Sequence, residues 1–332
     1  MTTAIVVGIF FTLLLATFAV YALFLRLGLR LARVENVSKR RVAAATLAVF
    51  GVQVVMRTLS ILSIGSGFVI ALYFSEIVVG ILASWAIIAV VFKIRLRRAI
   101  VAWLPTLLTS IAVLPAAILI VRPHLVEAYK PPTNSMAPTI LGPHRRSTCP
   151  VCGQPAFGAP LEETHGEPLL ICEAFHVSEV PEGNDLHSGD RFLVLKTIEP
   201  RRWDLIVFHY PEDPEVVFVK RLVGLPGETV TIDDGGVLRI DGERLTPPAE
   251  LAGLRYENDM SGPWKLWGHP SRPARLGPDE YFVLGDFSLR SKDSRLWQDA
   301  LPGHQPFAVP LDQVEGVVTH IYWPPARARV LR

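Results

Sequence analysis

A serine and a distant lysine are the two residues whose surroundings point most directly to chemistry. Ser135 lies in segment 132–139, just after a long apolar region, and Lys220 ends the apolar run 216–219. A serine hydroxyl is a poor nucleophile at its own pKa, so a base must lie within hydrogen-bond reach of its oxygen. Histidine is the usual base, but the nine histidines are scattered, and none lies in a run typical of a serine hydrolase. The sequence therefore favours Ser135 as a nucleophile and Lys220 as its base.

Lys220 can act as a base only if its amine is neutral near physiological pH. Lysine titrates near about 10.4 in water, so this role needs a pKa lowered by roughly two to three units, which corresponds to roughly 3 to 4 kcal/mol. Burial against apolar strands can supply a shift of this size. We therefore expect the chain to carry the Lys220 amine into an apolar interior.

The composition divides the 332-residue chain into two parts that face different solvents. Half of the residues are apolar, and the excess lies almost entirely before Pro123, whereas charged residues, Gly and Pro concentrate after it. The formal net charge is only +2, and the basic residues form no aromatic-interleaved stripe that would follow a phosphate backbone. We predict a helical transmembrane region at residues 1–125 and a separate domain at 126–332, with no nucleic-acid partner.

The apolar region contains runs long enough to cross about 30 Å of hydrocarbon. They lie near residues 4–25, 42–63, 66–92 and 99–121. These runs predict four transmembrane spans. Arg57 interrupts the second run, and a short interfacial helix would explain the same residues, so three spans are the alternative.

Basic residues set the orientation of these spans. The loop after the first span carries Arg26, Arg30, Arg33, Lys39, Arg40 and Arg41. The turn before the last span carries Lys93, Arg95, Arg97 and Arg98. The positive-inside rule assigns both to the cytoplasm. With four spans, the N-terminus and everything after Arg122 lie on the extracytoplasmic side. The first segment lacks a basic start and is too long for a typical signal-peptide core, so we expect a retained anchor.

The second part of the chain reads as a mainly antiparallel β domain. Short β-branched and aromatic runs separated by turn residues lie at 191–196, 205–209, 216–223, 229–232, 237–240, 281–284 and 314–322. Two stretches resemble insertions: residues at about 143–188 are rich in Cys, His, Pro and Gly, and those at about 245–278 are rich in Pro, Gly and Trp. We expect neither insertion to be needed to close the sheet.

Four motifs follow one another along this domain. They are TNSMAPT at 133–139, GDRFLVLK at 189–196, KRLVGLPGE at 220–228 and GDFSLRSKDSRLW at 285–297. Their content and order resemble the type I signal peptidases, or leader peptidases, which are serine/lysine dyad proteases. The resemblance covers most of residues 126–325. It implies a signal-peptidase-like antiparallel β fold in which Ser135 attacks the scissile carbonyl while Lys220 takes its proton and later protonates the leaving amine.

The resemblance also assigns supporting roles. The backbone N–H of Ser135 and the hydroxyl of Thr133 would form the oxyanion hole, Ser291 would orient the lysine amine, and Asp293 and Arg295 would form an ion pair that holds the site together. The family often has Ser-Gly-Ser at positions 133–135. The methyl group of Thr133 stiffens its rotamer, and Asn134 is acceptable there because Asn tolerates unusual backbone angles.

Two further charged residues in these motifs have a plain structural interpretation. Asp286 follows a glycine, as turn aspartates do, and Arg221 follows the lysine on a predicted strand. We expect a turn aspartate and a surface arginine at these positions.

The implied substrates are secretory preproteins whose signal peptides end in a small-x-small sequence. The implied location is the cytoplasmic (inner) membrane, where a multi-pass protein carries its catalytic domain outside the cytoplasm, in contact with the lipid bilayer and the export machinery. No cofactor is required for this chemistry. Two alternatives stay open: a peptidase dedicated to one secretion or conjugation substrate, and a catalytically inactive membrane scaffold.

The first insertion contains a metal-binding pattern. Cys149 and Cys152 have the spacing of one half of a zinc knuckle, and Cys172 is followed four residues later by His176. A structural zinc ion bound by these three cysteines and this histidine would brace the insertion. A metal-free remnant and a Cys149–Cys152 disulfide are the alternatives.

Overall fold

The computed structural model describes residues 2–35, 37–62, 69–160, 169–179, 185–258 and 266–332. The chain forms two compact units, 3–122 and 123–332. Parts of both predicted insertions, 161–168, 180–184 and 259–265, lie outside the described residues, as do residues 63–68 and the side chain of Arg57.

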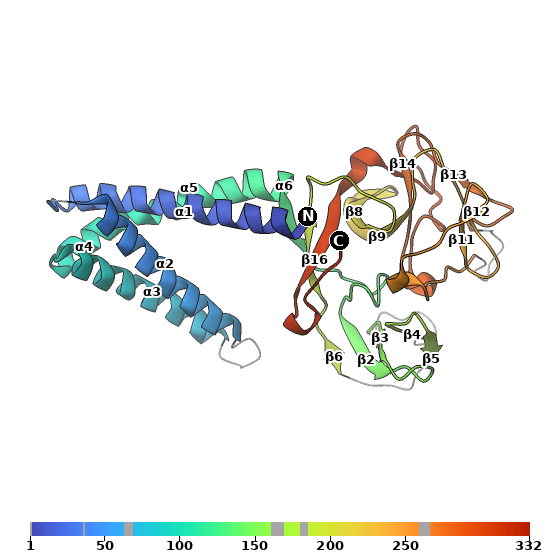
Figure 1. Ribbon diagram of the computed structural model, residues 1–332, viewed down its shortest axis with the longest axis horizontal. Helices are drawn as coiled ribbons and strands as arrows, with labels where there is room; N and C mark the ends of the chain where they lie inside the picture. The colour runs from blue at the N-terminus through green and yellow to red at the C-terminus, as the bar shows by residue number, and fades with distance from the viewer. Residues whose placement is uncertain (1, 36, 63–68, 161–168, 180–184, 259–265) are drawn as a thin grey trace. The chain divides into compact units, whose positions relative to one another are not determined.

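The first unit is helical (Figure 1). Its elements are α1 (Thr2–Leu31), α2 (Lys39–Leu62), α3 (Val69–Phe92), α4 (Leu96–Trp103), a 3-10 turn (Leu104–Leu107), α5 (Leu108–Ala116), a π-helical turn (Ala117–Val121) and α6 (Arg122–His124). Within the described residues, three helical segments are long and apolar enough to cross a membrane: Thr2–Leu31, Ser75–Phe92 and Leu96–His124. Helix α2 does not meet this criterion, so the fourth span stays a prediction.

The helices of this unit meet at the ends that carry the basic residues. Leu29 near the end of α1, Val42 near the start of α2, Phe92 at the end of α3 and Ala99 in α4 belong to one buried cluster. Gly28 lets α1 approach α4 closely, because a Cβ atom there would lie 1.9 Å from the carbonyl oxygen of Ala102. One end of the helical unit is therefore both tightly packed and basic.

The second unit is built on antiparallel β-sheets. The described part of its largest sheet has eight strands in the order β1-β7-β16-β8-β9-β14-β15, with β17 beside β16. The strands are β1 (Val126–Tyr129), β7 (Arg191–Leu195), β8 (Leu205–Tyr210), β9 (Asp213–Gly224), β14 (Glu280–Leu284), β15 (Val309–Pro310), β16 (Val314–Trp323) and β17 (Arg329–Val330).

A second sheet contains β12 (Glu243–Arg244), β11 (Leu238–Ile240), β10 (Thr229–Ile232) and β13 (Ala274–Arg275), in that order. All seven strands predicted from the sequence are confirmed, with ends that differ by at most three residues. The predicted antiparallel β architecture is therefore correct.

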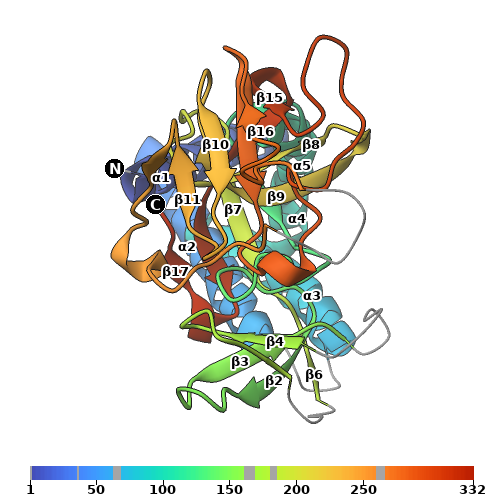
Figure 2. The same ribbon diagram turned by 90° about the vertical axis from the view of Figure 1, so that its right-hand side faces the viewer.

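The first insertion forms a sheet of its own. Strands β5 (Val177–Glu179), β4 (Leu169–Cys172), β3 (Pro155–Gly158), β2 (His144–Thr148) and β6 (Leu186–His187) pair in that order. Figure 2 shows β2, β3, β4 and β6 as a layer separate from β7 and β16. The described strands of this insertion do not pair with the large sheet.

The second insertion does contribute to a sheet, which corrects the expectation from its composition. Its strand β13 pairs with β10, and Leu251, Leu254 and Tyr256 are buried in the same cluster as Val230. The described part of this segment lacks strand alternation because Leu251, Leu254 and Tyr256 enter the core from outside the strands. It completes the hydrophobic core beneath the second sheet.

Candidate active site

The segment that carries Ser135 has no regular secondary structure and is held by hydrogen bonds from its own polar groups. The backbone N–H of Ala137 donates to the Asn134 carbonyl at 2.9 Å, and that of Phe287 donates to the Ser135 carbonyl at 3.1 Å. The buried Asn134 side chain accepts from Gly142 N–H at 3.0 Å and donates to the Pro143 carbonyl. Asn134 has no positive φ, so its role here is hydrogen bonding rather than tolerance of unusual backbone angles.

A second set of contacts holds the end of this segment against β7. Leu141 N–H donates to Asp190 Oδ2 at 2.9 Å, and Asp190 N–H donates to the Leu141 carbonyl at 2.7 Å. Arg327 Nε donates to Asp190 Oδ1 at 2.9 Å, and Arg327 Nη2 donates to the Pro138 carbonyl at 3.1 Å. No local pattern in the sequence pointed to Arg327, because its partners are brought to it only by the fold.

Lys220 meets Ser135 across the sheet. Lys220 lies opposite Ile206 on the neighbouring strand β8, and its side chain is almost fully buried. Lys220 Nζ and Ser135 Oγ are hydrogen-bonded at 2.7 Å. The two residues that the sequence selected as nucleophile and base are therefore in direct contact.

Burial lowers the pKa of the Lys220 amine from 10.5 to about 8. The charge of Asp293 opposes this effect, and that of Arg295 adds to it. The amine also lies 5.4 Å from the centroid of the Phe218 ring. A substantial fraction of this lysine is therefore neutral slightly above neutral pH, as a general base requires.

Ser291 lies beside the nucleophile segment, and a glycine makes this approach possible. A Cβ atom on Gly285 would lie 2.0 Å from Ser291 Oγ and 2.8 Å from the Ser135 carbonyl oxygen. The buried Ser291 hydroxyl has no hydrogen-bond partner among the described residues. Its expected role in orienting the Lys220 amine stays a prediction.

Asp293 and Arg295 form a fully buried ion pair. Arg295 Nε and Nη2 donate to the two carboxylate oxygens of Asp293, both at 2.8 Å. Asp293 Oδ2 also accepts from Gly285 N–H at 2.9 Å, while Arg295 donates to Ser288 and to the Glu257 carbonyl. Because each charge has several partners, the pair can stay buried. It holds the loop after β14 next to Lys220.

The sequence-based interpretation of Arg221 and Asp286 was wrong. Both side chains are buried rather than exposed, and Arg221 Nε and Nη2 donate to the Asp286 carboxylate at 2.6 and 2.5 Å. Thr139 donates its hydroxyl to the same carboxylate. This ion pair ties β9 and the loop after β14 to the nucleophile segment, and the sequence could not reveal it because the partners come from separate motifs.

A groove opens above the Ser135–Lys220 pair. It has a volume of about 270 Å³, and its lining includes Thr133, Met136, Phe192, Phe218 and both residues of the pair. In the described part of the chain, β9 pairs with β14 only from Arg221 onward, whereas residues 213–219 pair with β8 alone. The groove is therefore mostly apolar and is bordered by a strand with one open edge.

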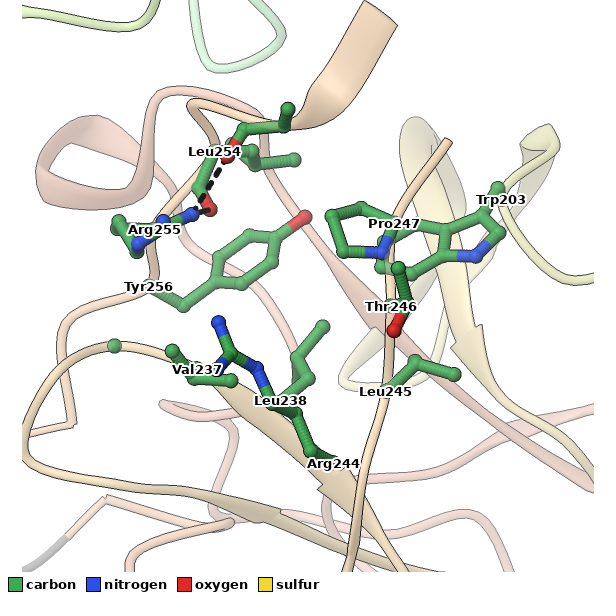
Figure 3. A pocket seen from close by; sticks show the side chains of 12 residues that line it. Trp203, Val237, Leu238, Arg244, Leu245, Thr246, Pro247, Leu254, Arg255 and Tyr256 are labelled. Carbon is green, nitrogen blue, oxygen red and sulfur yellow. Dashed lines mark hydrogen bonds between the residues drawn. The ribbon is translucent and has the colours of Figure 1, made fainter. Parts of the chain in front are cut away.

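A second cavity, of about 220 Å³, lies elsewhere in the same unit (Figure 3). Its walls include Trp203, Arg244, Pro247 and Tyr256, and Arg255 turns to the carbonyls of Ala252 and Leu254. Its lining contains neither Ser135 nor Lys220. We therefore place the candidate active site in the groove and not in this cavity.

The structure also brings together the four residues of the predicted metal-binding pattern. The ligand atoms of Cys149, Cys152, Cys172 and His176 all lie within 4.8 Å of one another. All three thiols are free, which argues against the Cys149–Cys152 disulfide. None of the four lines the groove, so this cluster is separate from the candidate active site.

Comparison with known proteins gives consistent matches. A family model described as signal peptidase, peptidase S26, matches residues 169–323. Signal peptidase I of Leptolyngbya laminosa is 31% identical over 198 residues, which cover 53% of this chain and 86% of that protein. Signal peptidase I of Bacillus licheniformis is 34% identical over 138 residues, covering 38% and 67%. The match to signal peptidase I of Pseudomonas aeruginosa, 27% identical over 202 residues, covers 55% of this chain and only 59% of that protein.

Replacing Gly285 by Ala should strongly slow peptide-bond cleavage, because Gly285 lies against both the Ser291 hydroxyl and the Ser135 backbone. The new methyl group would displace Ser291 or the Ser135 backbone, and a displacement of about 1 Å at reacting atoms costs on the order of 100-fold in rate. Cleavage rates of the purified full-length variants measure this effect. Gly51→Ala, where the methyl group meets nothing within 4 Å, is the matched control; equal rates for the two variants would contradict the prediction.

Replacing Lys220 by Met should stabilise the protein at neutral pH. The folded-state pKa of about 8 is lower than the ordinary value of 10.5. Below pH 8 the amine is protonated in both the folded and the unfolded state, so burial of its charge destabilises the fold by about 3 kcal/mol. This destabilisation decreases as the pH rises to 10.5, because the amine of the folded state is then neutral. Loss of the bond to Ser135 removes about 1 kcal/mol of the gain. Thermal unfolding in detergent should show a higher Tm for the variant at pH 7 and a shrinking difference toward pH 10. Replacement of the exposed Lys130 by Met should give no such trend.

Proposed function

Because the chain belongs to the signal peptidase I family of peptidase S26, we propose that it is a membrane-bound serine endopeptidase that removes N-terminal signal peptides from exported preproteins. The observation that carries this proposal is the 2.7 Å hydrogen bond between Ser135 Oγ and the buried Lys220 amine. A buried lysine with a pKa near 8 next to a serine hydroxyl is the arrangement that nucleophilic catalysis needs.

The chemistry proceeds in two steps. In the first, neutral Lys220 takes the proton of Ser135 as Oγ attacks the scissile carbonyl, and the protonated amine then gives this proton to the departing amine of the mature protein. In the second, a water molecule loses its proton to Lys220 and attacks the acyl-enzyme, which releases the signal peptide and restores Ser135. The same lysine serves as base and acid in turn.

The negative charge that develops on the carbonyl oxygen needs preorganised donors. The backbone N–H of Ser135 and the hydroxyl of Thr133 are our candidates, since both residues line the groove. Thr133 is exposed, so its hydroxyl can reach a bound substrate. The loss of one such donor typically costs about 100- to 1,000-fold in rate.

The open edge of β9 supports binding of an extended peptide. Residues 213–219 have one unpaired edge in the described part of the fold, and this edge leads directly to Lys220. A substrate strand can pair with such an edge through its main chain while pockets select alternate side chains. The apolar lining and the small volume of the groove, about 270 Å³, favour small residues before the cleaved bond, which is the small-x-small pattern.

The helical unit supports anchoring in the cytoplasmic membrane with both basic loops in the cytoplasm. The end of α1, the start of α2, the end of α3 and α4 share one buried cluster, so their basic flanks lie together. Helix α3 ends at the basic end of the helical unit, so it begins at the opposite end. Because α1 also ends at the basic end, α2 must carry the chain across to that opposite end. We therefore keep four crossings, with α2 packed against α3 and the catalytic unit outside the cytoplasm. In this arrangement the enzyme can meet its preprotein substrates, and the export machinery, at the bilayer.

The geometry disfavours an inactive scaffold. Burial of Lys220 is costly for stability, and a scaffold gains nothing from a costly buried amine that contacts a serine. A peptidase dedicated to one secretion or conjugation substrate would use the same dyad, and only substrate tests distinguish it from a general signal peptidase.

The pH dependence of cleavage should report the titration of Lys220. Only the neutral amine can accept the Ser135 proton, so kcat/KM should rise about tenfold per pH unit below an apparent pKa of about 8 and level off above it. The measurement is a pH profile on a peptide substrate without titratable groups near the cleavage site. A profile that stays flat between pH 6 and pH 9 would be incompatible with Lys220 as the base.

Cleavage of a precursor with an Ala-x-Ala signal tests the function itself. The detergent-solubilised wild-type chain should cut after the last small residue, and Ser135→Ala and Lys220→Ala should each lose at least about 1,000-fold in kcat while remaining folded. Lys39→Ala, an exposed lysine of the helical unit that does not line the groove, serves as the lysine control. Variants that cut as well as wild type would refute the dyad, and an inert wild type would refute general signal peptidase activity.

A further inference from the structure

We propose that Cys149, Cys152, Cys172 and His176 form a structural zinc site that folds the first insertion and holds its other face against the segment that carries Ser135. This site is separate from the catalytic chemistry.

Two pairs of ligand atoms have the spacing of a tetrahedral zinc site, and all four atoms lie within 4.8 Å of one another. With Zn–S bonds of about 2.3 Å and Zn–N bonds of about 2.0–2.1 Å, tetrahedral geometry places two sulfurs about 3.8 Å apart and a sulfur and a nitrogen about 3.6 Å apart. Cys152 Sγ and Cys172 Sγ are 3.7 Å apart, and Cys149 Sγ and His176 Nδ1 are 3.9 Å apart. The sulfur–sulfur distance is far longer than the roughly 2.05 Å of a disulfide. The site is therefore shaped for a metal and not for a cross-link.

Two turns present these ligands. In the first, after β2, Gly153 N–H donates to the Cys149 carbonyl at 2.9 Å, and Gly153 has a φ of +71°, which glycine adopts without strain. In the second, between β4 and β5, Phe175 N–H donates to the Cys172 carbonyl at 2.9 Å, and Cys172 N–H donates to the His176 carbonyl at 3.1 Å. Strands β3 and β4 pair directly, which brings the two turns to the same end of the sheet.

Backbone donors also surround the two buried sulfurs. The N–H groups of Val151 and Cys152 interact with the Cys149 sulfur, and those of Ala174 and His176 interact with the Cys172 sulfur. Donors of this kind orient metal ligands and stabilise thiolates. Four protein ligands fill a tetrahedral shell, so the zinc ion is structural and has no open position for catalysis.

Alternation along the strands divides the insertion sheet into two faces. Ala156, Leu170 and Cys172 lie in a small buried cluster with Cys149, while Phe157 and Ile171 lie in a different cluster. Among the described residues, the cluster on the cysteine face consists of these four, which is little apolar surface with which to stabilise a small sheet. A zinc ion supplies the missing stabilisation on that face.

The opposite face packs against the nucleophile segment. Phe157 and Ile171 share their cluster with Ala137 and Leu141, which follow Ser135 closely in the chain, and with Phe287. Zinc binding on one face of the sheet therefore positions the apolar face that supports the active-site loop.

Charged and backbone contacts reinforce this link. The Arg327 guanidinium lies over the Phe157 ring at 5.4 Å and also contacts Glu173 in the second turn at 3.9 Å. The carbonyl oxygen of Ala174 approaches Gly253 so closely that a Cβ atom there would lie 2.5 Å away. The second turn is thus held between the catalytic fold and the other insertion.

Metal analysis of the full-length chain, purified in detergent without chelator, tests the site directly. Wild type should contain one zinc per chain, and Cys152→Ser, Cys172→Ser and His176→Ala should each contain much less. His187→Ala removes a histidine of the same insertion that lies outside the cluster and should keep its zinc. Wild type without zinc, or ligand variants with as much zinc as wild type, would overturn the proposal.

Cobalt substitution and thiol counting identify the ligands without any assay of activity. Protein loaded with Co²⁺ should show the intense visible bands of a tetrahedral ion and a near-ultraviolet thiolate-to-cobalt band that weakens in Cys152→Ser. After denaturation with chelator but no reductant, three thiols should react with an alkylating probe. A cobalt spectrum without thiolate character, or a count of one thiol, would contradict the site and would favour a disulfide.

The link to the active site has its own test. Removal of zinc should make residues 144–179 more sensitive to a protease and should lower kcat for signal-peptide cleavage about tenfold, while the apparent pKa of the pH profile stays near 8. Unchanged proteolysis and kcat after confirmed zinc loss would refute the mechanical link. A wild type that binds zinc but cleaves no precursor would refute the proposed function and leave the zinc site standing.

Discussion

The burial of one amine is the constraint on which the rest of the catalytic unit depends. Lys220 must lose most of its hydration to act as a base, and this destabilises the fold at neutral pH. Burial is the largest effect on its pKa and decides the direction of the shift, while Asp293 and Asp286 raise the pKa and Arg295 lowers it. The surrounding strands β8, β9 and β14 must therefore be stable enough to keep a charged or neutral amine in place next to Ser135.

An irregular segment carries Ser135, and its order comes from buried polar contacts. Asn134 closes the turn from within, while Asp190 and the Arg221–Asp286 pair hold it from the sheet side. A buried carboxylate or guanidinium with all its partners in place resists displacement, because an unpaired charge would remain after any shift. These contacts can therefore hold the Ser135 loop as rigidly as a strand, although the loop forms no strand.

The first insertion has little core of its own, and its order also depends on a few specific contacts. Its sheet has one face toward the catalytic fold and one face closed by sulfur ligands. A sheet this small buries little apolar surface of its own, so contacts on both of its faces contribute to its stability. The proposed zinc ion and the active-site loop are thus parts of one mechanical arrangement.

The sequence by itself determined seven of the strands, the apolar helices and the choice of Ser135 and Lys220 as the candidate pair, because period-2 alternation, long apolar runs and an ordered set of motifs are local signals. It could not determine the partners of Arg221 and Asp286, the position of Arg327 or the sheet role of the second insertion. Those contacts join residues far apart in the chain, and an ion pair leaves no trace in the residues around either partner. Only the tertiary structure decided them, since long-range packing brings the charges together and removes the water that would otherwise surround them.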